Sequence, residues 1–512
     1  MVSPDSGLHT CSEPVHGCCR HAHLYCPPRK PHRMDNHRQH LARGFNWLGG
    51  AAIAARVMDI ASTVIALMFL TKEQVGIAAM VIATGMVIEA LDGIGAAEAL
   101  VQAPRISRTQ YDSLFWFVMT AAAVIGLLTW LLAKESGSLF GIGGIAGYFA
   151  AVALKQPLVA GAVIPLAQMN RALQYERIAA VGLAGTFGGA LTRAGLAVCG
   201  AGSWALVAAY TISGACILTA SLMAHPFRPR LRFRFITIRF LLRFGIRSAS
   251  ASLLDQVFRN IDFLLVGGLY GPASLALYRV AFDVAMEPAM AVSQLIKRAT
   301  LPVFSRMAHT PPALQEGVTW ALRRLLMLVT PVTIGLILAA HPLLALLKDG
   351  HGGSYAAAAL PLQLLAGAAL LRVMLELMFP LMLATGQPGM AAKLSATTLT
   401  LLSLGILGSG LVLPPEQGVI AAAASWLAIY PCALLWASRY VHRRWGWSPW
   451  IWLHTIRGSV ERATVLVLVV IGLETLAGTA PPMLRLVMIA AIITIGSLLP
   501  LSQRKKGPSS TG

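Results

Sequence analysis

The chain is a succession of long apolar stretches separated by short polar segments. A helix that crosses the hydrocarbon core of a bilayer needs roughly 20 mostly apolar residues, and about fourteen stretches meet this requirement. The pattern therefore predicts an all-α integral membrane protein with about fourteen transmembrane helices. The predicted spans are residues 46–70, 75–100, 113–133, 145–166, 178–199, 203–224, 244–268, 273–296, 320–346, 356–383, 390–413, 418–438, 463–480 and 483–500.

Lysine and arginine are distributed unevenly among the segments between these spans. One alternate set of loops holds only Lys72, Lys134, Lys348 and Arg485. The other set is rich in arginine, and it includes the residues around Arg105, Arg171, Arg323 and Arg443. Because cytoplasmic loops carry the excess of positive charge, the second set is predicted to be cytoplasmic, together with both termini. The bias keeps its phase through all the spans, which supports their count.

The composition agrees with a membrane protein. The chain has 512 residues, of which 56% are hydrophobic and 12% are charged, whereas a soluble domain has about 25% charged residues. The net charge of +20 would suggest nucleic acid as a partner of a soluble protein. In a membrane protein it indicates basic loops facing anionic lipid, so we expect membrane lipids and no nucleic acid as partners.

The ends of the chain differ from its middle. Residues 1–44 are polar, show no periodicity and are expected to form a disordered tail, with Met34 as a possible true start. Their cysteines and histidines do not repeat a paired C-x-x-C pattern, so we expect no metal site. Residues 501–512 are expected to form a cytoplasmic tail.

The longest inter-span segments, 225–243, 297–319 and 439–462, are basic and predicted to be cytoplasmic. No outward loop is long enough to fold into a domain, which argues against a membrane glycan polymerase or ligase. No Walker A lysine motif and no catalytic triad stands out, so a transporter rather than an enzyme is expected. The segment 225–243 and the start of the span that follows it contain no acid and seven arginines: Arg228, Arg230, Arg232, Arg234, Arg239, Arg243 and Arg247.

Charged residues also occur inside the predicted spans. Asp255, Arg259 and Asp262 would together cost about 8–10 kcal/mol if they faced lipid, at roughly 2.5–3.5 kcal/mol each. They must therefore face protein or water, and their spacing places them on one helical face, where Arg259 can pair with either acid. The other such residues are Arg56, Asp59, Glu89, Asp92, Lys155, Arg193, Arg279, Asp283, Glu287, Arg372 and Glu376.

These charges favour a polar, water-filled cavity between two helix bundles, where arginines bind an anionic group such as phosphate. The acids would balance charge or carry a coupling ion. The alternative is that these charges form ion pairs that hold helices together. For Arg372 and Glu376, the ion pair and the cavity role are equally supported. Lys155 and Arg193 can instead snorkel to an interface.

An ordered series of local motifs runs from about residue 45 to 310. It comprises Leu70–Gly76, Leu91–Gly95 with Ala99–Gln102, Gly200–Leu206, Arg243–Gly245, Arg259–Asp262, Gly267, Gly271, Leu275, Tyr278, Ala281, Arg298, Pro302, Ser305 and Arg306. The series resembles the polysaccharide-transport family of bacterial O-antigen and exopolysaccharide flippases, in particular the colanic-acid type. This family is part of the superfamily that includes MATE multidrug exporters and the lipid II flippase. Asp283 and Glu287 look unusual for the family.

The resemblance implies two pseudo-symmetric six-helix lobes, residues 45–224 and 244–438, joined by the linker 225–243, with two further helices over 463–500. It also implies alternating access of the lobes to a polyprenyl-diphosphate-linked oligosaccharide in the bacterial inner membrane. Glycosyltransferases, a polymerase and a chain-length regulator would be its partners. The candidate residues for the diphosphate are Arg56, Arg259, Arg279 and Arg298. The candidate coupling or pairing acids are Asp59, Asp92, Asp255, Asp262 and Asp283.

No cofactor is implied, and the coupling ion would be a proton or sodium. Three alternatives stay open at this point: a lipid II flippase, a cation-coupled multidrug exporter and, from a different class, a membrane glycan polymerase.

Overall fold

The structure is a computed structural model. It describes residues 32–92, 95–103, 105–140, 144–448 and eight isolated positions beyond residue 456. The predicted spans 463–480 and 483–500, residues 1–31 and the C-terminal tail lie outside the described residues, apart from those isolated positions. The chain divides into a unit of residues 1–46 and a unit of residues 47–512. Apart from the start of α1 (His32–Phe69), the description below concerns the second unit.

The described residues form helices throughout, apart from short turns, the linker and one isolated bridge between Lys348 and Ser354. The first half of the chain contains α1 (His32–Phe69), α2 (Lys72–Asp92), α3 (Ala96–Gln102), α4 (Arg108–Phe140), α5 (Ile145–Arg171), α6 (Tyr175–Val198) and α7 (Trp204–Ala224). The second half contains α8 (Phe235–Tyr270), α9 (Pro272–Met307), α10 (Pro311–Leu346), η1 (Tyr355–Ala358), α11 (Ala359–Glu376), α12 (Met378–Ala384), α13 (Pro388–Val412) and α14 (Pro415–Trp445).

Each of the first twelve predicted spans coincides with one helix or with two or three consecutive helices. Ten spans within the described residues are long and apolar enough to cross a membrane. The helices α8 and α9 are equally long but are not among the ten, and they carry the densest intramembrane charge. The chain is thus an all-α integral membrane protein.

Two helix boundaries differ from the prediction. Helix α1 begins at His32, so residues 32–44 are helical rather than part of a disordered tail. Helix α8 begins at Phe235, so only residues 225–234 of the predicted linker are non-helical. Both extensions contain no proline, and a helix satisfies its own backbone hydrogen bonds, so it can continue past the apolar stretch that predicts it.

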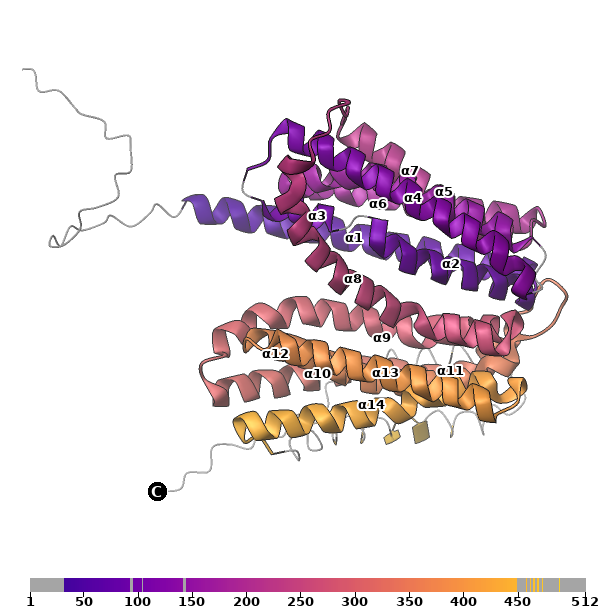
Figure 1. Ribbon diagram of the computed structural model, residues 1–512. Helices are drawn as coiled ribbons and strands as arrows, with labels where there is room; N and C mark the ends of the chain where they lie inside the picture. The colour runs from indigo at the N-terminus through magenta and orange to yellow at the C-terminus, as the bar shows by residue number, and fades with distance from the viewer. Residues whose placement is uncertain are drawn as a thin grey trace, which may run out of the picture. The chain divides into compact units, whose positions relative to one another are not determined.

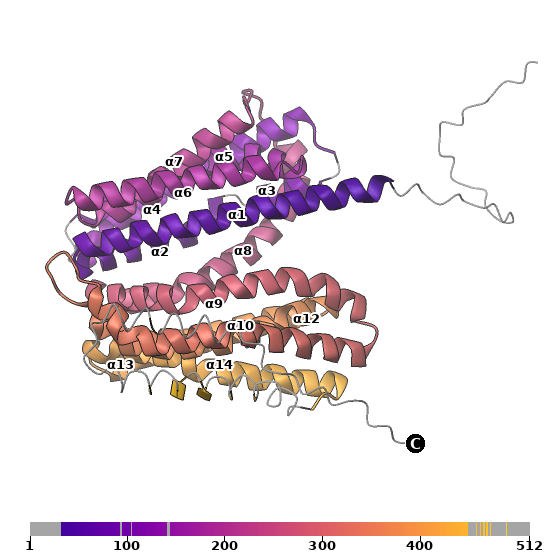
Figure 2. The ribbon, with the colours of Figure 1, turned by 180° about the vertical axis from the view of Figure 1, so that it is seen from behind.

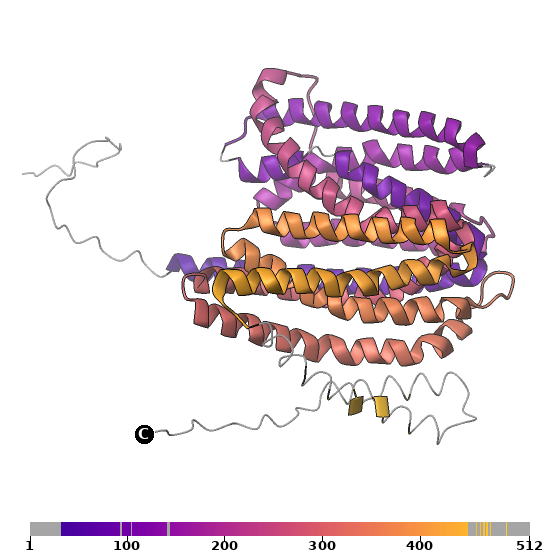
Figure 3. The same cartoon turned by 60° about the horizontal axis from the view of Figure 1, so that its bottom comes forward.

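The helices form two bundles that share α8. Helices α4 to α7 lie together on one side, and α9 to α14 lie together on the other (Figures 1 and 2). The start of α8 packs Ile238, Leu241 and Leu242 into the first bundle, while Phe263 and Val266 join the core of the second. Viewed from below, α13 and α14, coloured orange to yellow, run side by side across the second bundle (Figure 3).

Helix α2 brings the two bundles into contact, since it packs against both α8 and α9. A Cβ added at Gly76 of α2 would lie 1.7 Å from the carbonyl oxygen of Pro272, at the start of α9. Only glycine therefore permits this approach. The same helix starts with a capping box, in which the backbone N–H of Gln74 donates to Thr71 Oγ1 and the backbone N–H of Thr71 donates to Gln74 Oε1.

Candidate functional site

A network of charged side chains connects the two bundles through the middle of α1. Arg193 of α6 donates to Asp59 at 2.7 Å, and Asp59 lies 3.6 Å from Arg56 on the preceding turn of α1. Arg56 in turn pairs with Glu287 of α9 at 2.8 Å. The order of charges is therefore alternating, from the first bundle to the second.

The sequence of α1 explains how this network is positioned. Arg56, Asp59 and Thr63 recur at helical spacing on one face, and Arg193 donates to both Asp59 and the Thr63 hydroxyl. The apolar residues Ile53 and Val57 are 70% and 62% exposed. Because exposed apolar residues are suited to lipid and charges are not, we infer that the first face points to the bundles and the second to the bilayer.

The α9 side of the network continues along one face of that helix. Arg279 donates to Asp283 at 2.8 Å, and Glu287 follows one turn later. All three side chains remain about a third exposed or less. Arg56 and Asp59 are exposed by 43% and 39% despite their place inside a predicted span. Since partly exposed charges in hydrocarbon are very unfavourable, this region must be accessible to water or to a polar ligand.

On α8, the structure separates the three charges that the spacing places on one face. Arg259 pairs with Asp255 at 2.8 Å, and both side chains are well exposed, by 39% and 61%. Asp262 does not pair with Arg259. It is fully buried and accepts a hydrogen bond from the Tyr278 hydroxyl at 2.9 Å. The expectation that Arg259 pairs with either acid therefore holds only for Asp255, because packing against α9 encloses the later turn of α8.

Asp262 belongs to a buried polar and aromatic cluster inside the second bundle. The Tyr278 hydroxyl also accepts a hydrogen bond from Trp426 Nε1 at 2.7 Å, so it bridges α8, α9 and α14. The guanidinium of Arg372 lies 5.6 Å from the Trp426 ring, within range of a cation–π interaction. Arg372 also lies 3.5 Å from Glu376, and both are largely buried, which favours the internal ion pair over a cavity role for these two residues.

The first bundle has its own charged cluster. Lys155 of α5 is almost fully buried and lies 2.7 Å from Glu89 of α2, which also accepts a hydrogen bond from the Tyr210 hydroxyl of α7. The alternative in which Lys155 and Arg193 snorkel to an interface is not the one observed, because Lys155 pairs with Glu89 and Arg193 pairs with Asp59. Glu89 is 29% exposed, so this cluster still reaches a polar surface.

The predicted residues thus fall into three places. Arg56, Asp59, Arg279 and Asp283 belong to the inter-bundle network, Arg259 and Asp255 form a separate exposed pair, and Asp262 is buried. The side chains of Asp92 and Arg298 lie outside the described part of the structure. No group of three or more potential metal ligands occurs among the described residues.

Two members of the inter-bundle network are absent from the predicted site. Glu287 stands out only as one member of the α9 series, and Arg193 only as an isolated charge. Their partners Arg56 and Asp59 lie far away in the sequence. The sequence does indicate that a charge within a span requires a partner, but it does not identify the partner residue.

Comparison with known proteins agrees with this architecture. A family model described as "Polysaccharide biosynthesis protein" matches residues 67–348. The chain is 25% identical to teichuronic acid biosynthesis protein TuaB of Bacillus subtilis (strain 168) over 163 residues, which are 32% of this chain and 33% of TuaB. It is 21% identical to lipopolysaccharide biosynthesis protein WzxC of Escherichia coli (strain K12) over 312 residues, which are 59% of this chain and 62% of WzxC.

Succinoglycan biosynthesis transport protein ExoT of Rhizobium meliloti (strain 1021) is 22% identical over 278 residues, 54% of this chain and 56% of ExoT. The matched regions therefore span from a third to about three fifths of these curated relatives.

Solved structures share the fold at low sequence identity. The lipid II flippase MurJ in an inward closed conformation matches with a TM-score of 0.70 and 12% identity, covering 88% of this chain and 97% of MurJ. An inward-facing MATE multidrug resistance transporter matches with a TM-score of 0.58 and 14% identity, covering 75% of this chain and 94% of that transporter. The family match and the fold together lead to one conclusion: this chain belongs to the polysaccharide biosynthesis protein family of membrane proteins and has the fold of the MurJ and MATE transporters.

Proposed function

We propose that this protein is a flippase that moves a polyprenyl-diphosphate-linked oligosaccharide across the bacterial inner membrane. The product would serve the synthesis of an exopolysaccharide, O-antigen or capsule. The family match and the names of TuaB, WzxC and ExoT support a role in polysaccharide synthesis. The transporter fold supports movement of a substrate rather than its chemical conversion.

The observation that carries the proposal is the ion pair between Arg56 and Glu287. It connects α1, which Arg193 of the first bundle binds through Asp59, with α9 of the second bundle at 2.8 Å, and both side chains remain partly exposed. A diphosphate offers arginine the same type of anionic oxygen as a carboxylate, with more charge. The substrate would replace Glu287 as the partner of Arg56 and thereby release one bundle from the other, which is the step that alternating access requires.

The other candidate residues would act around this exchange. Arg259 and Arg279, each held by an acid one turn away, and Arg298 would complete the binding of the diphosphate. Asp59, Asp255 and Asp283 would keep these arginines oriented when the substrate is absent. Asp92 and the buried Asp262 are candidates for a coupling proton or sodium ion.

The cellular setting is part of the same proposal. The oligosaccharide would be assembled on the cytoplasmic leaflet by glycosyltransferases, and it would be used outside by a polymerase and a chain-length regulator. Both termini would be cytoplasmic, as the distribution of lysine and arginine predicts.

The test separates binding by Arg56 from a purely structural ion pair. The variants Arg56→Gln, Glu287→Gln and the charge swap Arg56→Glu with Glu287→Arg would be expressed in a strain that lacks its own exopolysaccharide flippase. Surface polysaccharide and the amount of protein in the membrane would both be measured. We expect Arg56→Gln and the swap to reduce export about tenfold or more at normal protein levels, since one charged hydrogen bond contributes roughly 1.5–3 kcal/mol.

The swap retains an ion pair across the bundles but moves the positive charge to α9. If the swap exported polysaccharide at the wild-type rate, Arg56 would act only in holding the bundles together, and its role in substrate binding would be refuted. Arg323→Gln, which removes an exposed arginine of α10, is the matched control and should export normally.

The alternative functions are tested in parallel assays. Rescue of cells depleted of their lipid II flippase would favour that substrate, and raised drug resistance would favour a multidrug exporter. Incorporation of sugar from an activated donor by the purified protein would establish a glycan polymerase.

A further inference from the structure

The linker between α7 and α8, residues 225–234, is held against α4 by its backbone. The Trp116 indole donates to the Arg230 carbonyl at 3.0 Å, and the Arg230 amide donates to the carboxylate of Asp112 at 3.3 Å. The Ser113 hydroxyl accepts from the Arg234 amide at 3.0 Å. Side chains of one helix thus bind successive main-chain groups of the linker, which fixes an extended segment that has no secondary structure of its own.

This arrangement leaves the linker side chains available. An extended chain points successive side chains to opposite sides, and here basic and apolar residues alternate. All four linker arginines are exposed, and none has an ion-pair partner among the described residues. They are Arg228, Arg230, Arg232 and Arg234.

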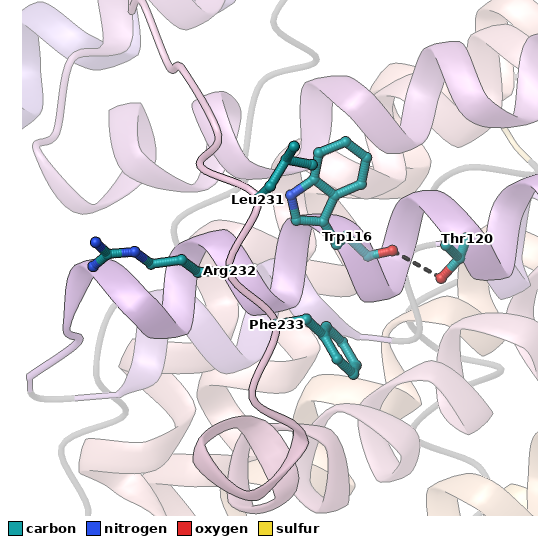
Figure 4. Close-up of a pocket in the computed structure, with 5 residues that line it drawn as sticks. All are labelled: Trp116, Thr120, Leu231, Arg232 and Phe233. Carbon is teal, nitrogen blue, oxygen red and sulfur yellow. Dashed lines mark hydrogen bonds between the residues drawn. The ribbon is translucent and has the colours of Figure 1, made fainter.

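Two apolar residues of the same region, Leu231 and Phe233, are also exposed, whereas Phe227 is buried against the first bundle. Leu231 is 88% exposed, and in Figure 4 it lies beside the indole of Trp116 while Arg232 points away from both. With Thr120 and Phe233, these residues line a surface pocket of about 420 Å³. The first turns of α8 continue the pattern, since Ile236 and Phe240 are 88% and 78% exposed.

We propose that the linker and the first turns of α8 form a docking surface for anionic phospholipid headgroups. The arginines would bind the phosphates, and Leu231, Ile236 and Phe240 would enter the acyl region beneath them. Charge complementarity selects this occupant, because seven arginines without an acid lie between residues 228 and 247. A basic segment beside a membrane helix attracts anionic lipid, and the apolar side chains exclude a small soluble anion as the main ligand. This surface does not depend on the proposed flippase activity.

The test is native mass spectrometry of the full chain in detergent, with phosphatidylglycerol and phosphatidylcholine of identical acyl chains as probes. The wild type should retain phosphatidylglycerol in preference. A quadruple variant replaces all four linker arginines by glutamine: Arg228→Gln, Arg230→Gln, Arg232→Gln and Arg234→Gln. It should lose affinity for phosphatidylglycerol by about tenfold or more, since each arginine near a membrane surface contributes severalfold to the affinity. Binding of phosphatidylcholine should be unchanged.

A matched control removes the same charge elsewhere. A second quadruple variant replaces four exposed arginines of α10 and α14 by glutamine: Arg323→Gln, Arg324→Gln, Arg443→Gln and Arg444→Gln. It should keep the preference for phosphatidylglycerol over phosphatidylcholine. Equal losses in both variants, or a retained preference in the linker variant, would overturn the proposal.

Two further measurements keep the test decisive. Should the glutamine variant fail to fold, the corresponding four Arg→Lys changes should retain the preference, and loss of preference in a folded lysine variant would contradict binding by charge. A polyprenyl diphosphate should not displace phosphatidylglycerol at equal concentration, and displacement would assign the surface to the transported substrate instead.

Discussion

The hydroxyl of Tyr278 connects two other buried polar side chains in the interior of the second bundle. It donates to Asp262 Oδ2 at 2.9 Å and accepts from Trp426 Nε1 at 2.7 Å, and all three residues are at most 2% exposed. The other oxygen of Asp262 has no hydrogen-bond partner. Replacing Tyr278 by phenylalanine would keep the ring and its packing against Phe263 but would leave Asp262 and Trp426 without a partner.

The expected cost follows from these two orphaned groups. A buried donor or acceptor that loses its partner costs about 1–3 kcal/mol, and more when it is charged, so the two would cost about 2–6 kcal/mol. Hydrogen bonds between membrane helices average only about 0.6 kcal/mol. We therefore expect the lower part of the range, a loss of about 2–3 kcal/mol for Tyr278→Phe.

The assay is thermal unfolding of the purified protein in detergent. Tyr278→Phe should lower the Tm by roughly 2–3 °C, since an unfolding entropy of about 2.1 cal/mol/K per residue amounts to about 1 kcal/mol/K for a chain of 512 residues. Tyr355→Phe is the matched control, because the Tyr355 hydroxyl is also buried but has no hydrogen-bond partner, and its Tm should stay unchanged or rise. Equal Tm values for the two variants would refute the reasoning that the hydroxyl of Tyr278 joins three helices.

Three further predictions concern other contacts. Gly76→Ala should lower the Tm and reduce transport, because the new methyl group would lie 1.7 Å from the Pro272 carbonyl and overpacking costs typically 1–3 kcal/mol; wild-type values for both would contradict this close approach. Asp112→Ala should speed tryptic cleavage of the linker severalfold, because it removes the carboxylate that accepts a hydrogen bond from the Arg230 amide. Asp112→Asn keeps an oxygen that can accept this bond and should not speed cleavage. Lys155→Met should destabilise the first bundle by about 1–2 kcal/mol in thermal unfolding, because Glu89 would lose its cation but remains partly hydrated.

The membrane class and the positions of the helices could be predicted from hydropathy. A stretch of about 20 apolar residues in the hydrocarbon core of a bilayer adopts a helix, because a helix satisfies the hydrogen bonds of every backbone group within the segment. The local ion pairs Arg279–Asp283 and Arg372–Glu376 also follow from spacing, since residues four apart are neighbours on a helix. The start of α8 at Phe235 could not be predicted in this way, because a helix that extends beyond the bilayer no longer requires an apolar sequence.

Apolarity and the order of charged residues along the chain were therefore enough to specify the helices, and the ordered motifs were enough to indicate the family. Which charges meet between different helices was decided by the tertiary structure alone. Arg56 finds Glu287, Arg193 finds Asp59, and Asp262 turns away from Arg259 toward Tyr278. These choices depend on how each helix is rotated about its own axis, and packing against distant helices sets that rotation.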